Sequence, residues 1–93
     1  MQKQMTYGDG QALMVLAAER MGLSPAMVED AKKLLAGKAV HPIFGAAISQ
    51  EACRMNNQLR HDATLIEAAN GHVKVLMAEY GFSLQADPVS EKG

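Results

Sequence analysis

The stretch AAERMGLSPAMV, residues 17–28, carries the strongest structural signals in this chain of 93 residues. Gly22 suits the left-handed C-terminal cap of a helix that contains the residues before it. Ser24 and Pro25 follow, and a capping serine before a proline at the first helical position is a common helix start. We therefore predict one helix over about residues 10–21, capped by Asp9 and buried on one face, and a second from Ser24 to a stop at Gly37. A very short turn would join them.

The segment from Met14 to Lys33 resembles the core of the helix-turn-helix motif. Ala18, Gly22 and Val28 stand where that motif has a small residue, a turn glycine and an aliphatic residue. The small residue lets two helices approach, the glycine permits the turn, and the aliphatic residue closes the corner. The resemblance implies a closely packed helix pair whose second helix could enter a DNA groove.

The charges argue against DNA as the partner. Glu29 and Asp30 lie near the start of the second predicted helix, where a DNA reader needs hydrogen-bond donors and cations. Lys32, Lys33 and Lys38 come later and would reach only phosphates. The whole chain has nine basic and ten acidic residues and a net charge of −1, which gives no long-range attraction to nucleic acid or to an anionic membrane. We keep a DNA-binding regulator as an alternative.

A long apolar stripe follows Pro42. Its members recur every three or four residues, which is typical of helices: Phe44, Ile48, Ala52, Met55, Leu59, Ala63, Ile66, Ala69, Val73, Leu76 and Tyr80. We predict a helix over about 42–60 and another over about 62–80, with Asp62 as the cap between them; one continuous helix is the alternative. Asn70 and Gly71 favour a turn, but the apolar register continues through them, and Gly81 would end the last helix.

Composition places the chain among small helical proteins. It is 48% hydrophobic but only 4% aromatic, without tryptophan and with seven methionines, which suits helices better than sheets. We predict an all-α fold: a small bundle of three to four helices in one domain over residues 1–84, with a disordered tail over 85–93. Cys53 is the only cysteine, and no leader or membrane-spanning run is visible, so we expect a cytoplasmic protein.

Nothing in the sequence has the spacing of catalytic or metal-binding chemistry. His41, His61 and His72 do not form a pair three or four residues apart, and Cys53 has no recognisable base or oxyanion motif. No phosphate-binding glycine loop is present. We expect no enzyme activity, no cofactor and no metal site.

We expect the chain to act by binding another protein. Two short N-terminal helices would leave part of the long stripe uncovered, and uncovered apolar surface seeks a partner. The residues expected to bind it are Met55, Leu59, Ile66, Val73, Leu76 and Tyr80. This face would also form a homodimer. A regulatory inhibitor such as an antiactivator, or an adaptor, would work by covering its partner's surface, and a small secretion-type chaperone is a further alternative.

Overall fold

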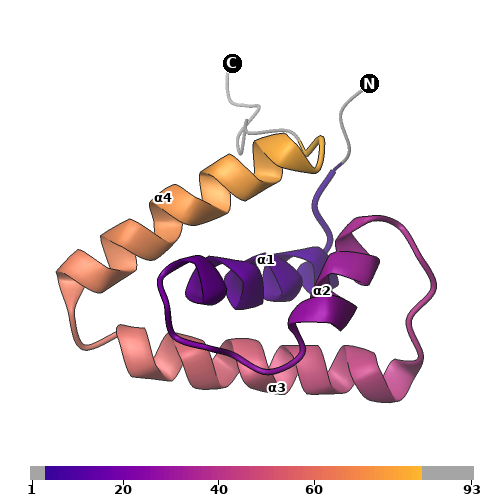
Figure 1. Ribbon diagram of the computed structural model, residues 1–93, viewed down its shortest axis with the longest axis horizontal. Coiled ribbons are helices and arrows are strands. Elements are labelled where there is room, and N and C mark those ends of the chain that lie inside the picture. Colours follow the sequence, from indigo (N-terminus) through magenta and orange to yellow (C-terminus); the bar gives the residue numbers. More distant parts are fainter. Residues whose placement is uncertain (1–3, 83–93) are drawn as a thin grey trace, which may run out of the picture.

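The structure, a computed structural model, describes residues 4–82. Over this range it contains four α-helices: α1 (Tyr7–Arg20), α2 (Val28–Leu35), α3 (Pro42–Leu59) and α4 (Ala63–Glu79) (Figure 1). The predicted all-helical class is therefore confirmed. The predicted tail over residues 85–93 lies outside the described residues. None of the described helices is long and apolar enough to cross a lipid bilayer.

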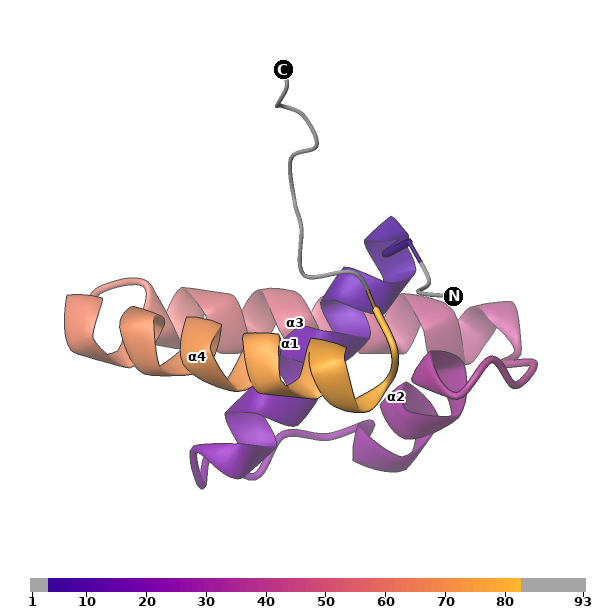
Figure 2. The ribbon, with the colours of Figure 1, turned by 90° about the horizontal axis from the view of Figure 1, so that it is seen from above.

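Helix α1 lies in the middle of the molecule. In Figure 1 it runs between α3 and α4, and Figure 2 shows that it crosses both at an angle. It contacts all three other helices, whereas α3 and α4 touch each other much less than either touches α1. Helix α2 packs mainly against α1. The core is consequently built around one central helix.

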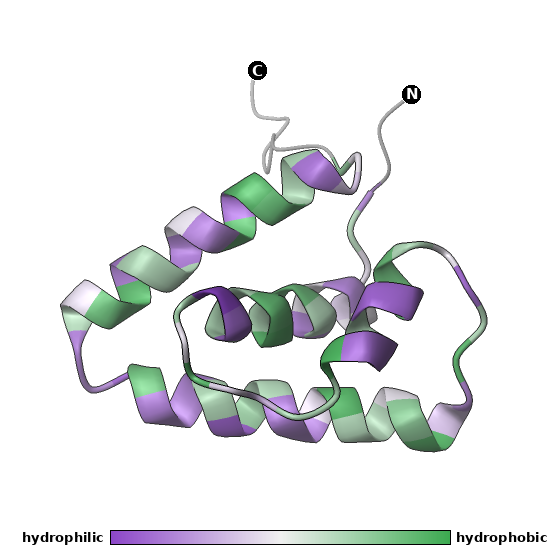
Figure 3. Cartoon of the chain, viewed as in Figure 1, coloured by the Kyte–Doolittle hydropathy of each residue, from purple (hydrophilic) through white to green (hydrophobic). Residues whose placement is uncertain are grey.

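The composition of α1 explains its central position. Figure 3 shows hydrophobic residues along its middle turns and hydrophilic ones toward its ends. Its buried residues are Ala12, Leu13, Val15, Leu16, Ala17 and Ala18. They surround the helix instead of forming the single buried face that we predicted, because α2, α3 and α4 pack on different sides of it. The alanines among them let these neighbours approach closely.

Glycines end three of the helices as predicted. Gly22 has a φ of +84°, which L-residues rarely adopt, and it follows the C-cap of α1. The next amide, Leu23 N, donates to Ala18 O at 3.1 Å and closes the Schellman motif. Gly37 and Gly81 form the same motif after α2 and α4. The three predicted stops are thus confirmed.

The start of α1 differs from the prediction. Thr6, not Asp9, is the N-cap, so the helix begins at Tyr7. Asp9 is the third helical residue and completes a capping box: Thr6 Oγ1 accepts from Asp9 N, and Asp9 Oδ2 accepts from Thr6 N, both at 3.1 Å. The reciprocal pair satisfies two backbone amides at once, which favours Thr6 over Asp9 as the cap.

The predicted start of the second helix at Ser24 is wrong. Helix α2 begins at Val28, after a non-helical connection over residues 21–27. Ser24 and Met27 have positive φ values of 53° and 67°, so neither residue continues a helix. Pro25 is buried instead of starting a helix. The helix pair expected from the helix-turn-helix resemblance exists, but a longer connection replaces the tight turn.

The two C-terminal helices separate where we predicted. Asp62 caps α4: its Oδ1 accepts from Thr64 N at 2.9 Å and from Leu65 N at 3.4 Å. The alternative of one continuous helix is therefore wrong. Asn70 and Gly71 lie inside α4 without interrupting it. Because the chain reverses at residues 60–62, α3 and α4 can enclose α1 from two sides (Figure 1).

Candidate interaction surface

The apolar face predicted to bind a partner is largely interior. Met55, Leu59 and Leu76 are at most 1% exposed. Ile66, Val73 and Tyr80 are half-buried, the last two against the core. The prediction that the stripe stays uncovered is therefore wrong for its three buried members. The physical reason is the position of α1, which covers α3 and α4 at the same time.

A groove lies where the first half of α1 passes over the middle of α3. It consists of two adjoining hollows of about 480 Å³ and about 310 Å³, which share Tyr7 and Cys53. Its principal side chains are Tyr7, Gln11 and Met14 from α1 and Ser49, Cys53 and Asn57 from α3. We call this surface the Tyr7 groove. The larger hollow has a volume in the range of ligand pockets, although it is open to solvent.

Tyr7 dominates one end of the groove. It is the first residue of α1, so the capping box of Thr6 and Asp9 fixes its backbone. Its side chain is nevertheless 80% exposed, and Met5, just before the helix, is 48% exposed. A large aromatic side chain on a rigid backbone loses little conformational entropy when a partner covers it.

The side chains of the groove offer several hydrogen-bonding groups. They are mostly uncharged, and the amides of Gln11, Asn56 and Asn57 can each donate and accept hydrogen bonds. Cys53 is exposed, but the described lining contains neither a histidine nor a carboxylate that could deprotonate its thiol. Arg54 is the only charged residue of the described lining, and its guanidinium is already paired.

That partner of Arg54 is Glu51, a carboxylate with only 8% exposure. Glu51 Oε1 accepts from Arg54 Nε at 2.9 Å, and Oε2 accepts from Arg54 Nη2 at 2.6 Å. Oε2 also accepts from the backbone amide of Ala26 at 2.7 Å. The Arg54 hydrogen bonds, helped by that of Ala26, hold the pKa of Glu51 below its ordinary value. Glu51 thereby ties the connection over residues 21–27 to α3.

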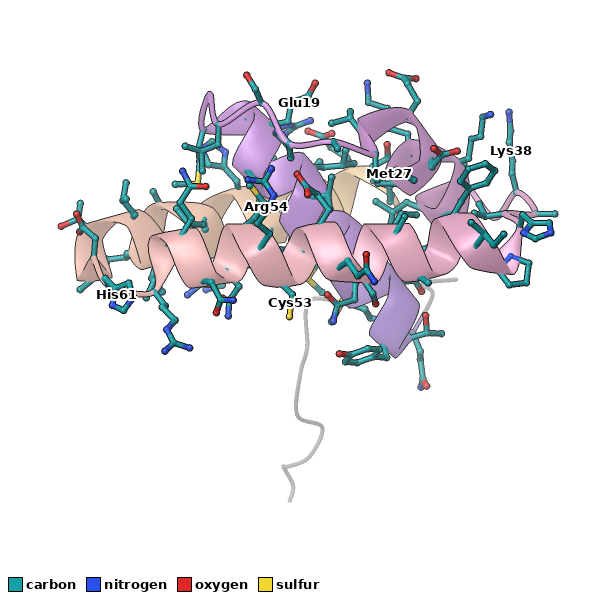
Figure 4. The ribbon with its side chains drawn as sticks, turned by 90° about the horizontal axis from the view of Figure 1, so that it is seen from below. Glu19, Met27, Lys38, Cys53, Arg54 and His61 are labelled. Carbon is teal, nitrogen blue, oxygen red and sulfur yellow. The ribbon has the colours of Figure 1, made fainter. Side chains whose placement is uncertain are left out.

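Figure 4 shows how α3 separates these two features. Arg54 points to the side of α3 on which Met27 lies, and Cys53 points away from it. Cys53 and the Glu51–Arg54 pair therefore lie on different sides of the same helix (Figure 4), and Arg54 borders the larger hollow of the groove.

A second ion pair joins the end of α1 to the end of α4. Arg20 Nη1 donates to Glu79 Oε2 at 3.0 Å, and Nη2 donates to Glu79 Oε1 at 2.7 Å. Both side chains are partly exposed. The hydrogen bonds from Arg20 lower the pKa of Glu79. The two-pronged geometry fixes the relative position of the two helices.

The region that resembles a helix-turn-helix does not gather positive charge. Glu29 is exposed in the first turn of α2 and pairs with Lys32 at 3.7 Å. Figure 4 shows Lys38 and His61 at opposite ends of α3, with Arg54 between them. A DNA-binding face needs its cations together along one side. The lysines and arginines among the described residues are distributed over all four helices and their connections: Arg20, Lys32, Lys33, Lys38, Arg54, Arg60 and Lys74.

The described histidines and acidic residues do not gather at one place. Residues 4–82 contain no group of three or more His, Cys, Asp or Glu that could hold a metal ion. His41 caps α3, because its Nδ1 accepts from Ile43 N at 3.1 Å. No family model, curated protein or solved structure matches the chain.

Sequence reasoning missed both Tyr7 and Glu51. Thr6 and Asp9, three residues apart, have the spacing of a capping box and could have indicated that Tyr7 is on a helix. Glu51 lies three residues after Ile48, on the side of α3 that carries the apolar stripe. A carboxylate on a core-facing side of a helix signals a buried polar partner.

Proposed function

We propose that this chain is a small, non-enzymatic interaction module that binds another protein through the Tyr7 groove. The observation that carries the proposal is the 80% exposure of Tyr7 beside a hollow of about 480 Å³. Exposed aromatic side chains next to hollows are typical of binding hot spots. Tyrosine, serine and asparagine together are also the residues of adaptable protein-binding surfaces, and Tyr7, Ser49 and Asn57 supply them here.

The partner segment should be apolar or uncharged where it enters the groove. Tyr7 and Met14 offer apolar surface, and the amides of Gln11 and Asn57 offer hydrogen bonds without a net charge. Because Arg54 is engaged by Glu51, the groove has little to attract an acidic segment. Binding would cover the partner's own surface, which is how a regulatory inhibitor such as an antiactivator, or an adaptor, works. We place this interaction in the cytoplasm, with which an unpaired, exposed Cys53 is compatible.

The test compares Tyr7→Ala with Phe44→Ala as bait in affinity capture from the native host. Phe44 is an aromatic residue at the start of α3, 47% exposed and outside the lining of the groove. We expect Tyr7→Ala to reduce recovery of the partner at least about tenfold, as loss of a hot spot does. Phe44→Ala should recover it like the unchanged chain. Equal recovery with Tyr7→Ala, while circular dichroism shows both variants folded, would contradict the proposal.

A DNA-binding regulator remains the competing function, based on the exposed lysines Lys32, Lys33 and Lys38. A gel shift at low salt separates the two proposals. Saturable binding that weakens steeply as salt increases would favour DNA. If no such binding is found, protein binding through the Tyr7 groove stays the preferred proposal over DNA binding.

A further inference from the structure

The outer face of α4 carries the spacing of a helix–helix seam. Thr64, Ala68, Gly71, Val75 and Ala78 are all exposed on it. They follow one another at intervals of four, three, four and three residues, which is the spacing of the two core positions in a heptad repeat. Val75 is 52% exposed although it is apolar. We call these five residues the α4 face.

Packing within a single copy of the chain does not require a glycine at position 71. It lies inside a helix of 17 residues, where glycine costs about 1 kcal/mol relative to alanine. A Cβ atom added there would meet no atom within 4 Å, so no described neighbour requires the missing side chain. Glycine would instead let a helix outside this copy approach closely.

The charged residues beside the α4 face indicate which helix from outside this copy packs against it. Glu67 and Lys74 are exposed, lie seven residues apart on the same flank, and form no ion pair with any described residue. Suppose that α4 of a second copy packs antiparallel, with its Ala68 opposite Gly71. Two-fold symmetry then places Glu67 opposite Lys74 of the second copy, and the reverse pair forms by the same rotation.

The same register also matches side-chain size. Ala68 meets Gly71 at the centre, and Val75 meets Thr64 farther out, so the helices come closest where the residues are smallest. Parallel packing would instead bring Lys74 next to Glu79, whose carboxylate Arg20 already holds at 2.7 Å. The free charges therefore fit the antiparallel arrangement.

We propose that the protein forms a two-fold symmetric dimer through the α4 face, with Glu67 of each copy paired to Lys74 of the other. The proposal does not depend on the Tyr7 groove, whose principal residues lie on α1 and α3. One helix of this length presents an interface about 25 Å long, which is at the small end for specific complexes. We expect a weak dimer with a Kd of about 10–100 μM.

Sedimentation equilibrium up to about 1 mM protein, well above that Kd, tests the pairing by charge reversal. Glu67→Lys and Lys74→Glu alone should each raise the Kd about tenfold, because each places like charges opposite one another twice. An equimolar mixture of these two variants should form a heterodimer, since every lysine again faces a glutamate. Lys38→Glu makes the same charge change as Lys74→Glu, but in the connection before α3, and it should leave the Kd unchanged.

Gly71→Leu tests the close approach. It should abolish the dimer without unfolding the chain, because the space around Gly71 is open in one copy. Circular dichroism would verify that the variant is folded. A chain that stays monomeric at about 1 mM, or a dimer unaffected by both charge reversals, would overturn the proposal. Partner capture by the Tyr7→Ala series is a separate measurement, so either proposal can fail alone.

Discussion

Replacing Glu51 with alanine should release the connection between α1 and α2 from α3. The carboxylate accepts from the partly buried amide of Ala26 at 2.7 Å, and alanine leaves that amide without this acceptor. A hydrogen bond to a charged group contributes about 1.5–3 kcal/mol. The side chain of Arg54 is 58% exposed and returns to water, so its ion pair adds little. We expect Glu51→Ala to lower the free energy of unfolding by about 2 kcal/mol.

Urea unfolding followed by circular dichroism measures this loss. With an m-value of about 1–2 kcal/mol/M for a chain of this size, the midpoint should fall by roughly 1–2 M. Arg54→Ala is the matched control, because it removes the exposed partner and leaves the hydrogen bond from Ala26. Its loss should be clearly smaller. Hydrogen exchange adds a local readout: the Ala26 amide should exchange faster in Glu51→Ala than in Arg54→Ala.

Equal destabilisation by the two variants would refute this reasoning. It would mean that the hydrogen bond from Ala26 adds little to the hold on the connection, because Glu51 and Arg54 both lie on α3 and their ion pair does not itself reach the connection. Unchanged exchange of the Ala26 amide in Glu51→Ala would lead to the same conclusion. The connection would then owe its conformation to the burial of Pro25.

Three further predictions concern the pH dependence of stability and two glycines. The arginine partners of Glu51 and Glu79 lower the pKa of each carboxyl group below 4.5. The stability that the two glutamates contribute is therefore present above about pH 4.5, and it is lost as the pH falls through the lowered pKa values. Urea titrations across this range should show a flatter pH dependence for the Glu51→Gln, Glu79→Gln double variant; an unchanged slope would contradict the assignment. Gly22→Ala, at a φ of +84° and with no atom within 4 Å of the new Cβ, should cost about 1 kcal/mol through backbone strain alone. Gly71 also lies in open space, but its backbone is helical, so Gly71→Ala should stabilise the chain by up to about 1 kcal/mol in dilute solution. Changes in the free energy of unfolding that have the same sign for Gly22→Ala and Gly71→Ala would contradict these two predictions.

Local signals in the sequence were enough to predict most of the helix ends. Gly22, Gly37 and Gly81 act through hydrogen bonds to the turn just before them, so neighbouring residues decide their effect. Asp62 likewise caps α4 through the next two or three amides. These features are short-range, and short-range patterns are what a single sequence can reveal.

The start of α2 was beyond local reasoning. Ser24 and Pro25 are a strong helix start by themselves, but burial of Pro25 and the hydrogen bond from Ala26 to Glu51 favour a non-helical connection. Glu51 is 25 residues away from Ala26, so no window around Ser24 contains it. Tertiary contacts therefore override the local preference at this point.

The candidate site was harder to predict than the fold. An apolar stripe does not distinguish a face buried by the chain itself from one that binds a partner, and Met55 and Leu59 belong to the first kind. Which kind applies depends on the crossing angle of α1, which helical periodicity does not contain. Tyr7 lies outside any apolar period in the sequence, so only its exposure in the fold identifies it.

The central position of α1 has a consequence for how the chain is made. During synthesis, α1 emerges before α3 and α4, the helices that enclose it. Its apolar residues, which face every side, must therefore wait for partners that are still being translated. Nascent chains with exposed apolar segments are prone to aggregation and engage chaperones. Native structure should consequently appear late and in one cooperative step, once α4 has left the ribosome and closed over α1.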